Sequence, residues 1–272
     1  MTKTKIEWAT DVWNPTVGCT KVSQGCKNCY AERYFHRFHP EEKFSEVKCY
    51  PERLIWPLHW KKPRMVFVDS MSDLFHEDVP SLFIDQVFEM MHFAWWHTFI
   101  ILTKRTEHMY NYISQRYLPN QRSVLPNVWL ITSIEDQPTA DERLPWLLKT
   151  PAAVRGVSVE PMLGPVDLSP KDHLVELISP WYSKNGFDPT ASQKVIDRAH
   201  WLFPKIDWVI CGCENGPRPM DLDWVRFLRD QCQDAGVLFF LKQARIDGKL
   251  VKMPELDGQI WAEYPKIDEN QI

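Results

Sequence analysis

The chain has 272 residues and a net charge of −4, with 44% hydrophobic, 25% charged and 13% aromatic residues. This length and composition suit a globular chain with a sizeable core, and they exclude disordered and collagen-like proteins. The net negative charge argues against a broad cationic face for nonspecific DNA binding.

The amino-terminal residues contain no signal-peptide core, because Met1 to Lys5 lead directly into Ile6-Glu7-Trp8. No apolar run approaches the roughly 20 residues that cross a bilayer. The chain has 7 cysteines, and this odd number argues against a disulfide framework. We therefore expect a cytoplasmic protein that contacts no membrane.

Three cysteines lie close together near the amino terminus, on a loop that we place at about residues 14–33. Cys19, Cys26 and Cys29 have the spacing C-x6-C-x2-C, and the chain then continues into a predicted helix. Three thiolates on one tight loop can each hold one iron of a [4Fe–4S] cluster, which leaves the fourth iron without a protein ligand. A cluster that activates a cofactor requires such an iron with an open coordination position.

A structural zinc site is the alternative interpretation of these cysteines. Its fourth ligand would be Cys49, His36 or His39. The protein would then be a zinc-stabilised nucleic-acid-binding protein without catalysis.

Beyond this loop, short apolar runs alternate with amphipathic segments, as in parallel βαβ units. Helical patterns cover residues 80–97 and 221–235, and Gly236 marks a carboxyl-terminal helix cap. The six runs predict a single α/β domain over residues 1–272, as a partial (β/α)6 barrel whose open side suits a large substrate. The runs are Met65–Val68, Phe99–Leu102, Val128–Ile131, Val154–Val159, Trp208–Ile210 and Val237–Leu241.

The spacing between strands lengthens near residues 169–204, which predicts an insertion. It is either a surface loop or a lid over the substrate.

Polar side chains follow nearly every apolar run. Because the carboxyl ends of parallel strands meet at one edge, we expect a shared pocket there, with solvated loops as the alternative. These side chains include Asp69, Ser70, Ser72, Asp73, Lys104, Ser133, Glu135, Glu160, Cys213, Glu214 and Lys242.

One basic stretch, residues 59–64 with the sequence His-Trp-Lys-Lys-Pro-Arg, is a candidate for local phosphate contact. The 13 tryptophans are candidates for base stacking, although tryptophan is more often a core residue.

Ordered sequence blocks along nearly the whole chain resemble the phage-encoded three-Cys-motif proteins, a radical-SAM-like family. The blocks include Trp13-Asn14-Pro15, the segment from Gly18 to Arg33, Asp69 to Phe75, Leu102 to Arg105, Ser158 to Val166, Glu214 to Met220, and Phe239 to Gln243. The resemblance implies a [4Fe–4S] cluster on Cys19, Cys26 and Cys29, with S-adenosylmethionine (SAM) on the open iron. Electrons from a donor would cleave SAM to a 5′-deoxyadenosyl radical that abstracts a substrate hydrogen.

The resemblance also implies roles for individual residues. Ser70, Ser72 and Asp73 are candidates for the methionine end of SAM, and Ser133 and Glu135 for its ribose. Tyr30 is a candidate cofactor contact, but it follows the last cysteine, whereas the commonest radical SAM pattern has its adenine-binding aromatic before that cysteine, where this chain has Asn28. Glu160 is assigned to the cofactor, with substrate or product as the alternative. Candidate catalytic residues are Lys104, Lys242, Glu214 and Cys213.

Cys213 stands where family members usually have glycine, in the sequence Gly212-Cys213-Glu214. It is either a small buried residue or a hydrogen donor or redox group near the substrate.

Some phage relatives are linked to hypermodification of thymidine in viral DNA, which protects that DNA from host restriction. The most specific expectation is the isomerisation of a glycinyl adduct of thymidine from an N-linked to a C-linked form. A base within DNA would have to be flipped into the pocket. The alternatives are a radical SAM lyase that repairs a pyrimidine lesion, or a reaction on a free nucleotide or peptide.

Overall fold

The computed structural model describes residues 4–117, 124–168 and 206–266. The insertion predicted at residues 169–204 lies outside the described residues.

Eight strands form the main sheet, in the order β1-β4-β5-β6-β7-β8-β9-β10. The strands from β1 to β9 in this order run parallel, and β10 is antiparallel to β9. Their bounds are β1 (Asp11–Trp13), β4 (Met65–Val68), β5 (Thr98–Thr103), β6 (Val128–Ile134), β7 (Val154–Val159), β8 (Trp208–Gly212), β9 (Leu238–Ile246) and β10 (Lys249–Lys252). The six predicted runs are thus confirmed as β4 to β9, whereas β1 and β10 were not predicted.

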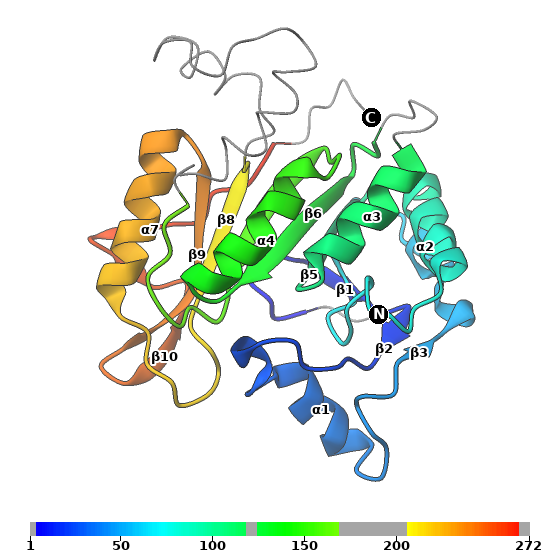
Figure 1. Ribbon diagram of the computed structural model, residues 1–272, viewed down its shortest axis with the longest axis horizontal. Coiled ribbons are helices and arrows are strands. Elements are labelled where there is room, and N and C mark those ends of the chain that lie inside the picture. The colour runs from blue at the N-terminus through cyan, green and yellow to red at the C-terminus, as the bar shows by residue number, and fades with distance from the viewer. Residues whose placement is uncertain (1–3, 118–123, 169–205, 267–272) are drawn as a thin grey trace, which may run out of the picture.

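Four helices cover one face of the sheet: α2 (Ser81–Phe93), α3 (Thr106–Tyr117), α4 (Gln137–Lys149) and α7 (Leu222–Ala235) (Figure 1). The predicted cap of α7 is confirmed, because Gly236 has φ 65° in the left-handed region. The predicted helix at 80–97 ends earlier, at Phe93.

The cysteine loop leads into α1 (Tyr30–Phe38), which lies apart from the four covering helices (Figure 1). Two small sheets complete the described chain, β2 (Thr16–Val17) with β3 (Lys48–Cys49) and β11 (Glu255–Leu256) with β12 (Gln259–Ile260). Single 3₁₀ turns span Gln24–Cys26, Pro51–Arg53 and Trp56–His59.

The main sheet is curled, as the contacts of Trp8 demonstrate. The Trp8 ring lies 4.9 Å from the Phe67 ring on β4 and 6.3 Å from the Trp208 ring on β8. These strands are four positions apart in the sheet, a separation of about 19 Å if the sheet were flat. One side chain reaches both because the sheet closes around it. The fold is therefore the predicted α/β partial barrel, open between its two edge strands.

Side chains alternate between the two faces of each strand. On β8, Val209 and Cys211 join the large outer core under the helices, whereas Trp208 and Ile210 join the inner aromatic cluster. The same alternation on neighbouring strands directs residues just beyond the inner cluster into the concave side of the barrel. Within the described residues, no helix is long and apolar enough to cross a membrane.

Candidate active site at the cysteine loop

The cysteine loop, residues 18–29, lies at the carboxyl end of the parallel strands, close to α1 (Figure 1). It begins at Gly18, whose φ of 105° is rarely adopted by residues with a side chain. The Gly18 amide donates to the Met71 carbonyl at 3.0 Å, and the Cys19 amide donates to the Phe44 carbonyl at 2.8 Å. These bonds tie the loop to the segment after β4 and to the segment between α1 and β3.

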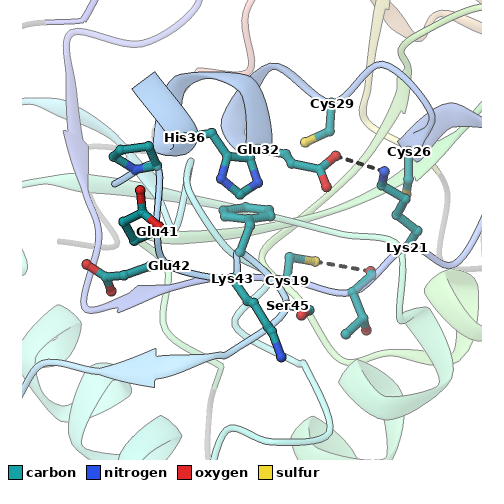
Figure 2. A pocket seen from close by; sticks show the side chains of 13 residues that line it. Cys19, Lys21, Cys26, Cys29, Glu32, His36, Glu41, Glu42, Lys43 and Ser45 are labelled. Carbon is teal, nitrogen blue, oxygen red and sulfur yellow. Dashed lines mark hydrogen bonds and ion pairs between the residues drawn. The ribbon is translucent and has the colours of Figure 1, made fainter. Parts of the chain in front are cut away.

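All three cysteines of the loop line one pocket of about 620 Å³ (Figure 2). Cys19 follows β2, Cys26 ends the 3₁₀ turn, and Cys29 is the residue before α1. Each thiol is partly exposed, and none forms a disulfide. Three accessible thiols from separate points of one loop therefore face the same space.

No three His, Cys, Asp or Glu side chains converge on a single metal position in the part of the chain that the structure describes. Of the predicted zinc ligands, His36 does line the pocket, whereas Cys49 packs against the outer core and His39 binds Glu42 at 2.9 Å. Of these three side chains, His36 is therefore the one that lies with the cysteines. Three cysteines around one pocket also fit a cubane cluster, because each of its irons takes a different cysteine around a bulky group.

The surroundings of the thiols differ. Burial raises the pKa of Cys19 to about 12, with a further contribution from Asp73. Burial also acts to raise the pKa of Cys26, but Lys104 and the backbone amides of Val22 and Ser23 outweigh it, so this pKa is lowered. Cys26 is therefore the thiol that its own surroundings favour as a thiolate.

Arg105 supports Cys19 from β5. Its Nη1 donates to Cys19 Sγ at 3.7 Å and to Asp73 at 3.3 Å, and its Nη2 donates to Thr20 Oγ1 at 2.8 Å. The buried His76 ring contacts the same Thr20 hydroxyl at 2.8 Å. A network anchored in the sheet thus fixes the position of the first cysteine.

Glu135 and Lys104 hold the middle of the loop. Glu135 is 1% exposed, forms an ion pair with Lys104, and accepts from Ser23 Oγ at 2.8 Å and from Arg143 at 3.2 Å. Burial lowers the pKa of Lys104 to about 8. Gly25 packs directly on the pair, since a Cβ atom there would lie 2.6 Å from Lys104 Nζ.

Glu214 holds the end of the loop. It accepts from Asn28 Nδ2 at 3.0 Å and from Arg218 Nη2 at 2.6 Å, and Arg218 also donates to the Gln24 carbonyl at 3.1 Å. Burial acts to raise the Glu214 pKa, but the bonds from Arg218 and Asn28 lower it to about 2. Lys104, Glu135 and Glu214 thus all contact the cysteine loop, although we expected Lys104 and Glu214 at the substrate.

Glu160 and Lys242 form a second charged pair, with Lys242 Nζ 2.5 Å from Glu160 Oε1. Gly212 lies beside it, because a Cβ atom there would be 3.3 Å from that oxygen. Both side chains of the pair are partly exposed, at 17% and 14%. Unlike Lys104, Glu135 and Glu214, these two residues bond to each other rather than to the cysteine loop.

Within the described residues, the other predicted SAM ligands already have partners, except for the Ser133 side chain. Asp73 accepts from Thr103 Oγ1 at 2.7 Å and from the Lys104 amide at 3.1 Å. Ser70 Oγ donates to Asn14 Oδ1 at 3.1 Å, Ser72 Oγ to the Gly18 carbonyl at 2.6 Å, and the Tyr30 hydroxyl to the Ser70 carbonyl at 2.7 Å. Ser133 is 7% exposed, and its backbone carbonyl accepts from Arg143. Asp73 and Ser72 therefore brace the loop in this structure.

The family and its structural neighbours are found by comparison with known proteins. A family model described as "Protein of unknown function (DUF5131)" matches residues 3–265. The chain belongs to this family. No curated protein matches the chain.

Solved structures of spore photoproduct lyase are similar to the chain at low identity. One variant has 14% identity and a TM-score of 0.45 over 77% of this chain and 57% of its own. Another, with bound AdoMet and dinucleoside spore photoproduct, has 12% identity and a TM-score of 0.38 over 84% of this chain and 62% of its own. The chain therefore spans about three fifths of these proteins, and the fold assignment rests on its own strand order and curl.

Cys213 lies on the outer side of the sheet. It belongs to the core under the helices, is 1% exposed, and its burial raises the thiol pKa to about 11. Gly212 ends β8 beside the Glu160–Lys242 pair, and Cys213, the next residue, packs into the outer core. Of the two interpretations of this residue, its position favours the buried structural one.

Two arginines that were not predicted from the sequence, Arg143 and Arg218, complete these supports. A signal for Arg143 existed, because it shares a helical face with Ala140 and Leu147, which are both buried. An arginine on a buried face needs a carboxylate partner, which is Glu135. Arg218 follows Glu214 at four residues, but outside any helix, and no periodicity identifies that pair.

The basic stretch at residues 59–64 precedes β4, so it lies at the end of the sheet opposite the cysteine loop. Trp60 is 8% exposed and its ring lies beneath Arg64 at 4.8 Å. The structure thus separates this stretch from the site.

Proposed function

We propose that the protein is a radical SAM enzyme in which Cys19, Cys26 and Cys29 hold a [4Fe–4S] cluster. The observation that carries this proposal is the placement of three partly exposed cysteines around one pocket. When bound, the cluster and SAM supply a 5′-deoxyadenosyl radical that abstracts hydrogen.

The protein's own residues position the loop. Arg105, Glu135 and Glu214 each reach it from a different strand end, and all three are buried. Such supports around ligands fix their geometry and tune the bound group. Ser133, on the concave side, and Tyr30 remain the proposed SAM contacts, and Glu160 takes its alternative role at the substrate.

The more specific proposal is isomerisation of glycinyl-thymidine from the N-linked to the C-linked form. The Glu160–Lys242 pair supports it chemically, because a glycinyl group carries an amine and a carboxylate and the pair offers one charge of each sign. Hydrogen abstraction at the glycyl α-carbon gives a radical stabilised by both neighbouring groups. In this proposal Lys242 binds the substrate carboxylate and Glu160 its amine.

The radical SAM assignment is tested by 5′-deoxyadenosine formation. Anaerobically reconstituted and reduced protein should convert SAM to 5′-deoxyadenosine, and a Cys26→Ala variant should not. Cys49→Ala is the matched control, since Cys49 lies outside the pocket lining and should leave turnover unchanged. Turnover by Cys26→Ala equal to that of the wild type would refute the assignment.

The substrate is tested with DNA that carries glycinylated thymidine. We expect a nucleoside of unchanged mass and altered retention after digestion, and its loss in a Lys242→Met variant. An oligonucleotide with a pyrimidine lesion serves as the second substrate. If only the lesion-bearing oligonucleotide were converted, the isomerase proposal would be wrong and the protein would be a lyase.

A further inference from the structure

The exposed side of α1 carries a column of aromatic side chains. Tyr30, Tyr34 and Phe38 follow one another at four-residue spacing and are 43%, 57% and 59% exposed. The Tyr34 and Phe38 rings lie 5.0 Å apart. The helix packs through the side next to this column, where Ala31 and Phe35 are buried. The aromatic column is therefore not part of the core of the described structure.

Three exposed cations accompany this column, namely Arg33, Arg37 and Lys27. None of them forms an ion pair within the ranges that the structure describes, whereas neighbouring Lys21 and Lys48 pair with Glu32 and Glu42. The chain as a whole has a net charge of −4. A local surface with unpaired positive charge thus lies on an acidic protein.

Helical geometry fixes the order of the two arginines, the aromatic column and the pocket-lining residues around α1. At about 100° per residue, Arg33 and Arg37 lie between the aromatic column and the side that bears Cys29, Glu32 and His36. Those last three residues line the cysteine pocket (Figure 2). The arginines therefore run along the edge of the pocket, and the aromatic rings lie just beyond them.

We propose that this α1 surface binds a single strand of nucleic acid next to the pocket. Arg33, Arg37 and Lys27 contact phosphates, and Tyr34 and Phe38 stack on bases. A nucleic-acid strand alternates phosphates and bases, so it matches the adjacent cationic and aromatic side chains. An acidic protein partner would match only the cationic ones. The inference rests on the proposed nucleic-acid substrate, whose flipped nucleotide requires a locally unpaired strand.

The test measures binding of a fluorescent oligothymidylate to the reconstituted full chain by anisotropy at several salt concentrations. Arg33→Gln/Arg37→Gln should weaken binding at least tenfold and reduce the salt slope by about 1.4, the value for two single-strand phosphate contacts. Tyr34→Ala/Phe38→Ala should weaken it roughly tenfold for each ring, with little change in slope.

Matched controls lie elsewhere on the protein. Lys61→Gln/Lys62→Gln removes two exposed cations at the opposite end of the sheet, and Phe93→Ala removes a 57% exposed ring on α2. Both should bind like the wild type. Wild-type affinity in the α1 variants, or loss of binding in the Lys61/Lys62 variant alone, would overturn the proposal.

An acidic redox protein is the competing partner for this surface. Suppose that the α1 arginine variant keeps its oligonucleotide affinity, and that its cluster is reduced more slowly than in the wild type by a flavodoxin-type donor but at the wild-type rate by dithionite. The surface would then bind the electron donor, and the proposal would be wrong. A failure of the proposed function would give a different result: the wild-type protein would form no 5′-deoxyadenosine, whatever its affinity for the oligonucleotide.

Discussion

Arg105 Nη1 lies 3.7 Å from Cys19 Sγ while the same guanidinium binds Asp73 and Glu77. The side chains of Arg105 and Asp73 are only 4% and 7% exposed. One buried cation therefore connects the first proposed cluster ligand to the sheet, and its hydrogen bond and charge both act on that sulfur.

Replacing Arg105 should weaken the cluster site and lower its reduction potential. Hydrogen bonds and positive charge near the ligands stabilise the added electron of a reduced cluster. Arg105→Gln should reduce cluster affinity roughly 10- to 100-fold, and Arg105→Lys, which keeps the charge, should shift the potential less. Potentiometric titration followed by electron paramagnetic resonance measures both. Identical potentials in the two variants and the wild type would contradict this role.

Gly25→Ala should displace the cysteine loop without unfolding the barrel. The new methyl group would overlap the buried Lys104–Glu135 pair, so the loop must move away from its support. We expect iron incorporation to fall at least several-fold while the melting temperature changes little. Gly164→Ala is the control, because a Cβ atom there lies 3.8 Å from Asp136, an ordinary contact. Equal iron content in both variants would show that the loop tolerates the shift.

Glu135→Gln should destabilise the protein strongly. The amide leaves the half-buried Lys104 and the buried Arg143 without their carboxylate, a loss of about 3–5 kcal/mol in the free energy of unfolding. Adding Arg143→Met should recover part of this loss, since it removes one of the uncompensated charges. Denaturant unfolding of both single variants and the double variant measures the coupling. Purely additive losses would be inconsistent with the shared ion pair.

The strands were predictable because each apolar run is buried on both faces, as parallel strands are. Val154–Val159 appears in the structure with the predicted bounds. β1 escaped prediction because its three residues are too few for a periodicity, and β10 because its residues are all exposed. Sequence alternation also places Lys104 and Glu135 at one rim. It does not reveal that they bind the cysteine loop, because Ser23 and Gly25 meet them only through tertiary packing.

Asp69 should make the protein less stable as the pH rises. Burial raises its pKa from 3.8 to about 8, and its Oδ2 has no hydrogen-bond partner in the described structure. The folded state therefore keeps a proton that the unfolded state releases above about pH 4. The contribution to stability is full below that pH and is lost at about 1.4 kcal/mol per pH unit until about pH 8.

Asp69→Asn isolates this effect from other titrating groups. Asparagine tolerates the left-handed backbone at this position, where φ is 58°. The variant should lack this component of the pH dependence, so its unfolding free energy should exceed that of the wild type increasingly from pH 5 to pH 8. A constant difference between the two proteins across this range would exclude a raised pKa.

The central claim is that Cys19, Cys26 and Cys29 together hold an iron–sulfur cluster. The most direct measurement is metal analysis of the anaerobically purified chain beside a variant with all three cysteines changed to serine, with circular dichroism as the check on folding. We predict about four irons per wild-type chain, with brown colour, and none in the folded variant. A colourless wild-type protein with one zinc per chain would contradict the account.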